Sequence, residues 1–209
     1  MVKRSVRIYI EGGAIGNTAD TDFRRGWKKF LSSLHQIAIS QNFHSLEVVR
    51  GKGRSDAFKR FRNHKKSNPN DLCVLLVDSE VAVPDNMNLW DVVANRVGDS
   101  WQRPSWASED HLYFMVPFIE AWLITDHDAL ATFFKRDFDP SVLPTTDIEN
   151  RTKIYIERAL QKATSRTKKG AYRHGDSHFI IEKTQPNKVR TLKHGNRLFE
   201  SLSALIKTS

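Results

Sequence analysis

The feature that most constrains the fold is an unbroken apolar run over residues 72–77. A short run of this kind is typical of a strand that is buried on both faces of a parallel sheet. Apolar-rich segments at 6–10 and 45–49 predict two further strands. Between the strands, apolar residues at helical spacing predict one helix capped by Asp22 and another over 54–66. This β-α-β-α-β order predicts a parallel α/β sheet with right-handed crossovers.

The rest of the chain is predicted to be mainly helical. We expect, in chain order, a helix over 89–97, a strand over 111–116, an apolar helix over 117–124, a short helix capped by Asp126 or Asp128 that reaches Phe134, an amphipathic helix over 148–163, a short strand over 178–182 and a closing helix over 198–206. A loop with two prolines over 137–144 is the candidate boundary. We predict a single domain over 1–209, with its core over about 1–135 and a helical C-terminal appendage over about 145–209.

Charge is distributed unevenly along a chain whose formal net charge is +9. The segments 50–66 and 151–173 each carry eight Lys or Arg and one acid, and 183–197 carries five Lys or Arg and no acid. Residues 76–150 carry fourteen acids against four Lys or Arg. Either basic segment alone would be interpreted as a solvated face. Together with the acidic middle they favour a metal centre set in a surface that binds nucleic acid.

Several features favour a cytoplasmic protein with no membrane partner. No apolar run approaches the length of a membrane span, and the first five residues lead directly into a predicted strand without the apolar core of a signal peptide. Cys73 is the only cysteine, so neither an internal disulfide nor a cysteine zinc cluster can form.

Acidic side chains follow two of the predicted strands where the strands end. Glu11 follows the strand over 6–10, and Asp78 and Glu80 follow the strand over 72–77. In parallel sheets the chemistry lies outside the carboxyl ends of the strands, and carboxylates gathered there typically bind a hard cation such as Mg2+ or Mn2+. Taken alone, each acid is better explained as a turn residue or a helix cap. Their matching positions favour a metal site.

These residues resemble a known family. Glu-Gly after the first strand and an acidic pair after the third are similar to the TOPRIM fold of topoisomerases, primases and OLD-type nucleases. The motifs of a closer resemblance, to a TOPRIM-like prokaryotic family related to RloB proteins, are Ile10 to Gly13, Leu76 to Glu80, Pro117 to Asp126 and Lys169 to Tyr172. The resemblance implies a TOPRIM-like, Rossmann-like parallel sheet flanked by helices, Mg2+ bound by the acids, and an ABC- or AAA-type ATPase partner encoded alongside in anti-phage defence loci. The chain departs from the usual Asp-x-Asp pattern by carrying Glu80 as the second acid.

Glu120 is a further candidate ligand. It lies among the apolar residues of 118–123, where burying an unpaired carboxylate would be costly. It therefore faces solvent, pairs with a cation or points to the metal site. The resemblance to OLD-type nucleases, which carry acids beyond the TOPRIM core, implies a second-metal or metal-adjacent role for Glu120. The alternative is a structural glutamate paired with an arginine.

A basic loop near the C-terminus contains Lys169, Tyr172, Arg173, His174 and His178. In a nuclease these groups could bind phosphate, stabilise developing negative charge or protonate the leaving oxygen. Lys169 is the candidate that we place in the catalytic set. A structural or plain surface role explains each of them equally well. The two histidines lack the further ligands of a zinc site.

The leading hypothesis is a Mg2+-dependent endonuclease that hydrolyses phosphodiester bonds, with Glu11, Asp78 and Glu80 as metal ligands and Glu120 assisting. The resemblance adds gating by the ATPase partner. The side chains expected to contact DNA or RNA, a tRNA among the RNA candidates, are Arg54, Lys59, Arg62, Lys65, Lys168, Arg173 and His174.

One alternative is a non-catalytic TOPRIM-like subunit that binds a partner or nucleic acid. This alternative stays open because Glu80 replaces the usual second Asp of the motif. A weaker one is a phosphotransfer or nucleotide-processing enzyme. The sequence leaves the oligomeric state open, a homo-oligomer included, and a basic surface that contains Trp residues would suit assembly on a partner.

Overall fold

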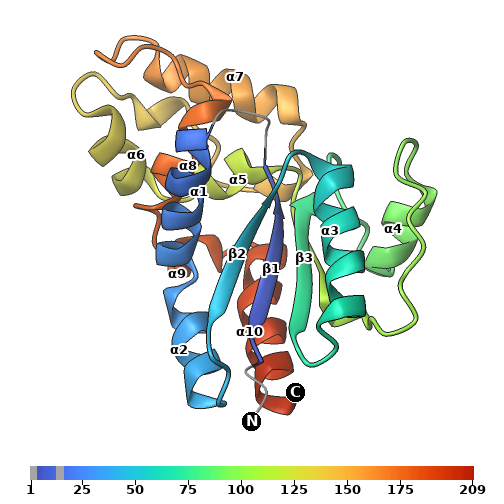
Figure 1. Ribbon diagram of the computed structural model, residues 1–209. Coiled ribbons are helices and arrows are strands. Elements are labelled where there is room, and N and C mark those ends of the chain that lie inside the picture. The colour runs from blue at the N-terminus through green and yellow to red at the C-terminus, as the bar shows by residue number, and fades with distance from the viewer. Residues whose placement is uncertain (1–3, 13–16) are drawn as a thin grey trace.

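The centre of the molecule is a four-stranded sheet in the computed structural model, which describes residues 4–12 and 17–209 (Figure 1). Its strands are β1 (Val6–Glu11), β2 (Leu46–Gly51), β3 (Leu72–Asp78) and β4 (Leu112–Met115). They pair in the order β2-β1-β3-β4, and all pairings are parallel. The predicted strands over 6–10, 45–49, 72–77 and 111–116 are therefore confirmed, and the chain has an α/β, Rossmann-like fold.

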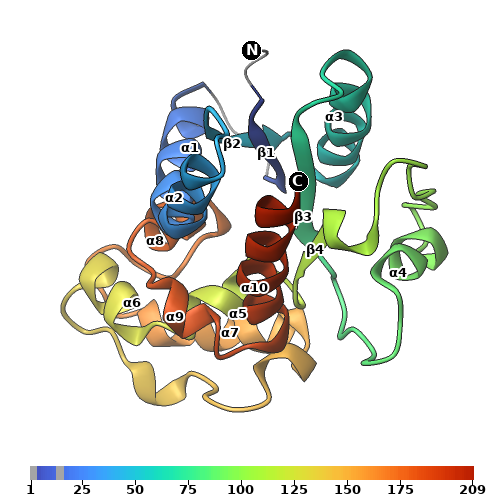
Figure 2. The ribbon, with the colours of Figure 1, turned by 90° about the horizontal axis from the view of Figure 1, so that it is seen from below.

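Helices cover both faces of the sheet, as Figure 2 shows from below. On one side lie α1 (Asn17–Phe30), α2 (Ser32–Ser40) and α10 (Lys193–Thr208), and on the other lie α3 (Arg54–Ser67) and α4 (Leu89–Asn95). Burial of both faces removes the polar-apolar alternation that a half-exposed sheet would show.

Strand β3 illustrates the point, because all seven of its residues are buried. Val74 and Leu76 belong to the hydrophobic cluster under α1, α2 and α10, whereas Cys73, Leu75 and Val77 belong to the cluster under α3 and α4. Successive side chains of a strand point to opposite faces. An unbroken apolar run is therefore what a two-sided strand requires.

The carboxyl ends of the strands are covered by short helices, which lie above the sheet in Figure 1. These are α5 (Ile119–Leu123), α6 (His127–Phe134), α7 (Lys153–Thr164) and α8 (Ser177–Ile181). The short helix α9 (Pro186–Val189) lies lower, at the level of the strands in Figure 1, and leads into α10. Single turns of 3-10 helix connect the longer elements: η1 (Glu109–His111), η2 (Pro140–Val142), η3 (Ile148–Asn150) and η4 (His174–Asp176). Within the described residues, no helix combines the length and the apolar character needed to cross a membrane.

Three features of the predicted secondary structure are wrong: a helix cap, the type of one element and the continuity of one helix. The first helix begins at Asn17, so Asp22 lies inside it instead of capping it. The predicted strand over 178–182 is instead helical over 178–181, which belong to α8. The predicted helix over 148–163 is divided into η3 and α7, with Thr152 as the cap of α7. A five-residue apolar run does not by itself distinguish a strand from a buried helix, and α8 packs against α1 and α5 instead of pairing with a strand.

The C-terminal helices share the core of the sheet domain. Leu202 and Ile206 of α10 belong to the same hydrophobic cluster as Val74 of β3, and α10 packs against α2 and β4. Ile156 and Leu160 of α7 belong to this cluster as well. The expected helical appendage is thus part of a common core, and the loop over 137–144 does not separate two hydrophobic cores among the described residues.

Candidate metal centre

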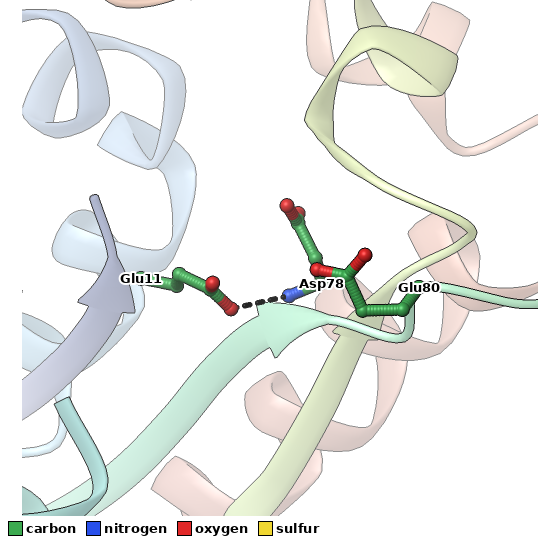
Figure 3. Close-up of side chains that lie close together, drawn as sticks. All are labelled: Glu11, Asp78 and Glu80. Atoms are coloured by element: carbon green, nitrogen blue, oxygen red, sulfur yellow. Dashed lines mark hydrogen bonds between the residues drawn. The ribbon is translucent and has the colours of Figure 1, made fainter. Parts of the chain in front are cut away.

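Three carboxylates converge at the carboxyl edge of the sheet, as Figure 3 shows. Glu11 ends β1, Asp78 ends the neighbouring strand β3, and Glu80 follows two residues later. One side-chain oxygen from each of the three lies within 4.8 Å of the others. The parallel pairing of β1 with β3 explains the meeting of Glu11 and Asp78, because parallel neighbours present their carboxyl ends at one edge.

Asp78 is the most buried member of the group, with 7% of its surface exposed. Its Oδ1 accepts a hydrogen bond from the backbone N–H of Ile119 at 3.1 Å, which fixes the side chain against the start of α5. Burial raises the pKa of Asp78 well above its usual range, and the neighbouring carboxylates of Glu11 and Glu120 raise it further. A negative charge at this position is therefore unfavourable unless a cation joins it.

Glu11 is oriented by two donors. Its Oε2 accepts from the backbone N–H of Asp78 at 3.2 Å and from Nη1 of Arg54 at 3.4 Å. Burial raises the pKa of Glu11, while the charge of Arg54 acts in the opposite direction. The residue after Glu11, Gly12, allows close packing: a Cβ there would lie 2.9 Å from the side chain of Arg50. Gly13, the last residue of the sequence motif, lies outside the described residues.

Arg54 is a buried residue that contacts two of the three acids. Its Nε donates to Oδ2 of Asp99 at 2.7 Å, and its Nη1 also donates to the backbone carbonyl of Asp78. The sequence interpretation placed this arginine on a surface that contacts nucleic acid. The guanidinium instead contacts acids of its own chain and lies 4.8 Å from the ring centroid of Trp101. In this conformation it is not available to a polymer.

Glu80 reaches the group through an unusual backbone conformation. Its φ is +72°, a left-handed value that a residue with a Cβ adopts at a cost of about 1 kcal/mol or more. Its backbone N–H donates to the carbonyl of Pro117 at 2.8 Å, which holds the turn. Its Oε2 accepts from Nζ of Lys153, at the start of α7, at 2.6 Å. The chain thus leaves the extended geometry after Asp78 and still brings both acids together.

Glu120 lies outside the group of three and has its own partners. It is 1% exposed, and its Oε1 accepts from the hydroxyl of Tyr172 at 2.7 Å and from Nδ1 of His174 at 2.6 Å. Its Oε2 is buried and has no hydrogen-bond partner within the described part of the chain. The hydrogen bond that His174 donates to Glu120 raises the pKa of His174. Burial, reinforced by the charge of Glu120, raises the pKa of Tyr172.

The lysine beside the carboxylates is Lys153, not the predicted Lys169. Lys169 is exposed, and its ammonium lies 4.3 Å from the ring centroid of Phe133 on α6. Lys153 contacts Glu80 and lies 4.9 Å from the ring centroid of Phe118. The Lys153–Glu80 contact joins residues 73 positions apart. No local sequence signal distinguishes Lys153 from the other basic residues of its segment.

The remaining residues predicted to bind nucleic acid are spread over distant parts of the surface. Lys59 and Arg62 of α3 are exposed, as are Lys168 and Arg173 near the covering helices. Lys65 lies at the opposite edge of the sheet, where it donates to the backbone carbonyl of Asp71 at the start of β3. The exposed residues could approach a polymer, whereas Lys65 is remote from the carboxylates.

A pocket of 410 Å³ adjoins two of the three carboxylates, those of Glu11 and Asp78. Glu11, Asp78 and His174 line it together with apolar side chains from α1 and α8. The centre is therefore accessible from a defined cavity and is not sealed in the core.

The chain matches a family model over residues 16–203, which is most of its length. It belongs to the DUF4276 family. This family is described as a domain of unknown function. No curated protein and no solved structure gives a significant match. The family therefore supplies no activity, and the proposals below depend on the geometry and on the motifs.

Proposed function

We propose that this DUF4276 chain is a Mg2+- or Mn2+-dependent endonuclease of TOPRIM type, related to RloB and OLD-type proteins, that hydrolyses phosphodiester bonds of nucleic acid. The observation that carries the proposal is the convergence of Glu11, Asp78 and Glu80 at the carboxyl edge of a parallel sheet. The basic surface of the chain supports a polyanionic substrate.

The residues fit a hard divalent cation on three counts. Oxygens that bind one octahedral Mg2+ lie about 3.0 Å apart when adjacent and about 4.2 Å apart when opposite, so a group within 4.8 Å can reach one ion after side-chain movements of up to about 2 Å. The raised pKa of Asp78 reflects burial of the carboxyl and repulsion by its neighbours, and a bound cation would offset both. The buried, unpartnered Oε2 of Glu120 is a further acceptor close enough to influence Asp78.

In this proposal Glu11, Asp78 and Glu80 hold the ion, which would activate water and stabilise the leaving oxygen. Arg54 and the backbone N–H of Ile119 keep Glu11 and Asp78 in position. Lys153 holds Glu80 and places a positive charge near the site, where it would attract a phosphate group.

Substrate binding would use the exposed basic residues Lys59, Arg62, Lys168 and Arg173, and His174 at the pocket. Such contacts weaken steeply with salt, since each neutralised phosphate releases counterions. Gating by an ABC- or AAA-type ATPase in an anti-phage system is part of the proposal through the resemblance of the motifs alone.

A second candidate, a non-catalytic binding subunit, is favoured by one observation. Two of the three carboxylates already contact cations of the chain, because Lys153 pairs with Glu80 and Arg54 pairs with Glu11. If these pairs balance the charge of the group, the site needs no metal.

Calorimetric titration with Mn2+ separates the two candidates. Wild type should bind Mn2+, Asp78→Ala should not, and Glu157→Gln, which changes an exposed acid on α7, should bind like wild type. The three proteins are then incubated with plasmid DNA and with total RNA. Cleavage by wild type and Glu157→Gln alone would support the nuclease. Absence of Mn2+ binding in the folded wild type would favour the binding subunit.

A further inference from the structure

The pocket beside the carboxylates has an apolar interior. Its walls include Phe23 and Trp27 of α1, Met115 of β4, and Phe179 and Ile181 of α8. Its volume of 410 Å³ falls in the range of small-molecule sites, about 300–1,000 Å³. A phosphodiester backbone is polar and charged, so it gains nothing from such walls. The apolar interior therefore has to be explained by another part of the substrate.

Polar side chains also line the pocket. Glu11 and Asp78 belong to the acidic group, and Arg50, Ser177 and His178 supply donors and acceptors. Burial lowers the pKa of His178, which favours the neutral ring with one donor and one acceptor nitrogen. An aromatic wall with a few hydrogen-bonding groups matches a nucleobase, which has an apolar face for stacking and a polar edge.

We propose that this pocket binds one nucleobase, with the phosphate of the same nucleotide directed to the three carboxylates. The inference rests on the proposed function for the reaction, and it adds the substrate class: an unpaired nucleotide, either within a single strand or free. A base inside a duplex would first have to unpair and leave the stack to enter the pocket, which opposes binding. Single strands should therefore be bound and cleaved in preference to duplexes.

The first test is a calorimetric titration of the intact chain in Mn2+ with a nucleoside 5′-monophosphate and, separately, with ribose 5-phosphate. Both ligands carry the sugar and the phosphate, so their difference isolates the base. We expect the nucleotide to bind at least about tenfold more tightly, since stacking of one base contributes a factor of this order or more. Equal affinities would overturn the proposal.

Phe179→Ala tests the aromatic wall, and Phe138→Ala is its matched control. Both phenylalanines are half-buried against the main core cluster, and each stacks on a phenylalanine of α6, Phe133 at 6.3 Å and Phe134 at 6.5 Å. Only Phe179 lines the pocket. Phe179→Ala should weaken nucleotide binding about tenfold and leave ribose 5-phosphate unchanged, whereas Phe138→Ala should change neither. Unchanged nucleotide affinity in folded Phe179→Ala would overturn the proposal.

If circular dichroism shows that Phe179→Ala is unfolded, Phe179→Leu takes its place, because leucine keeps most of the apolar volume and removes the stacking ring. The second test compares cleavage of a single-stranded oligonucleotide with that of the same sequence as a duplex. A preference for the single strand of about tenfold or more, lost in the Phe179 variant, supports the pocket as a base site. Equal cleavage of both forms would overturn the inference and leave the nuclease standing.

The free nucleotide and the nucleotide within a strand are distinguished by competition. A nucleotide that binds alone and displaces the oligonucleotide supports the pocket as their common site. The protein could bind a nucleotide in a way that depends on Phe179 and yet cleave no polymer. That result would support the proposed base pocket and contradict the proposed nuclease activity.

Discussion

The two ends of β3 each carry a buried aspartate, and the pair differs in its partners. Asp71, just before the strand, is 6% exposed, and Asp78, at its end, is 7% exposed. Asp71 accepts from the backbone N–H of Ser5 at 2.7 Å, from Nε of Arg7 at 3.1 Å and from Nε2 of His64 at 2.8 Å. Burial alone would raise the pKa of Asp71, but these hydrogen bonds outweigh it and lower the pKa.

Burial raises the pKa of Asp78, and the carboxylates that it faces raise the pKa further, since the side chain has only one backbone donor to oppose them within the described residues. Two aspartates of similar solvent exposure therefore have opposite pKa shifts, because Asp78 lies deeper in the protein and faces carboxylates, whereas Asp71 lies among hydrogen-bond donors. At the amino edge, donors of the same chain satisfy the carboxylate of Asp71, which is typical of a structural residue. At the carboxyl edge, Asp78 and the neighbouring carboxylates repel one another and the fold does not relieve this repulsion, which is typical of a functional site.

The largest effect is expected at the satisfied edge. Asp71→Ala removes the acceptor of three donors and leaves the N–H of Ser5 buried without a partner. We expect the free energy of unfolding to fall by about 2–3 kcal/mol, with allowance for the partial exposure of Arg7. Urea unfolding measures the change. A loss below about 0.5 kcal/mol would contradict the assignment of Asp71 as a structural residue.

Gly26→Ala tests how closely α8 approaches α1 at the other edge. A Cβ on Gly26 would lie 2.3 Å from the carbonyl oxygen of His178. This change inside a helix ordinarily stabilises by up to about 1 kcal/mol. Here we expect destabilisation of about 1–3 kcal/mol, since the added methyl would displace α8, a wall of the pocket. Thermal or urea unfolding decides the sign, and stabilisation would show that α8 moves freely.

Asp78→Asn should stabilise the metal-free protein at neutral pH by about 1 kcal/mol, because it removes a buried charge that repels its neighbours. A carboxyl whose folded pKa is raised binds more protons in the folded state. Wild type therefore loses stability as pH rises from about 4, the unfolded pKa, through the folded pKa. The advantage of the variant should grow over the same interval. Asp71→Asn, as the matched control, should be destabilised.

Mn2+ should raise the melting temperature of wild type, and the rise should be absent in Asp78→Asn. A rise of equal size in both proteins would place the binding of Mn2+ elsewhere on the molecule.

The smallest effect concerns His174, whose ring is more than half exposed. Its hydrogen bond to Glu120 raises its pKa, so this contact adds stability below pH about 6.5 that is lost as pH rises through the folded pKa. Glu120→Gln should lower the pKa of His174, and Tyr172→Phe should leave it near the wild-type value. NMR titration of the ring protons measures both. An unchanged pKa in Glu120→Gln would show that the contact does not form in solution.

Much of the site could be predicted because its acids lie at or just after the ends of two predicted strands. Glu11 and Asp78 follow apolar runs whose parallel pairing places both ends at one edge. Glu80 was predicted beside them by its spacing, although it reaches the group through a left-handed turn and not through extended backbone. Local pattern and sheet geometry are sufficient for this part.

The partners of the acids could not be predicted in the same way. Lys153, Arg54 and His174 are three among the many basic residues of their segments, and the Glu120–His174 contact joins residues 54 positions apart. The helix α8 was predicted as a strand, because five residues contain too little periodicity to decide. The base pocket that we propose depends on this helix and on α1.

The sequence by itself determined the parallel sheet, the helices on its two faces and the edge at which the acids gather. It did so because apolar periodicity and strand ends are local properties that parallel pairing converts into position. Only the tertiary structure decided which aspartate is satisfied and which is not. That difference depends on groups brought from distant elements: burial raises the pKa of both aspartates, the donors around Asp71 outweigh it, and the carboxylates around Asp78 add to it.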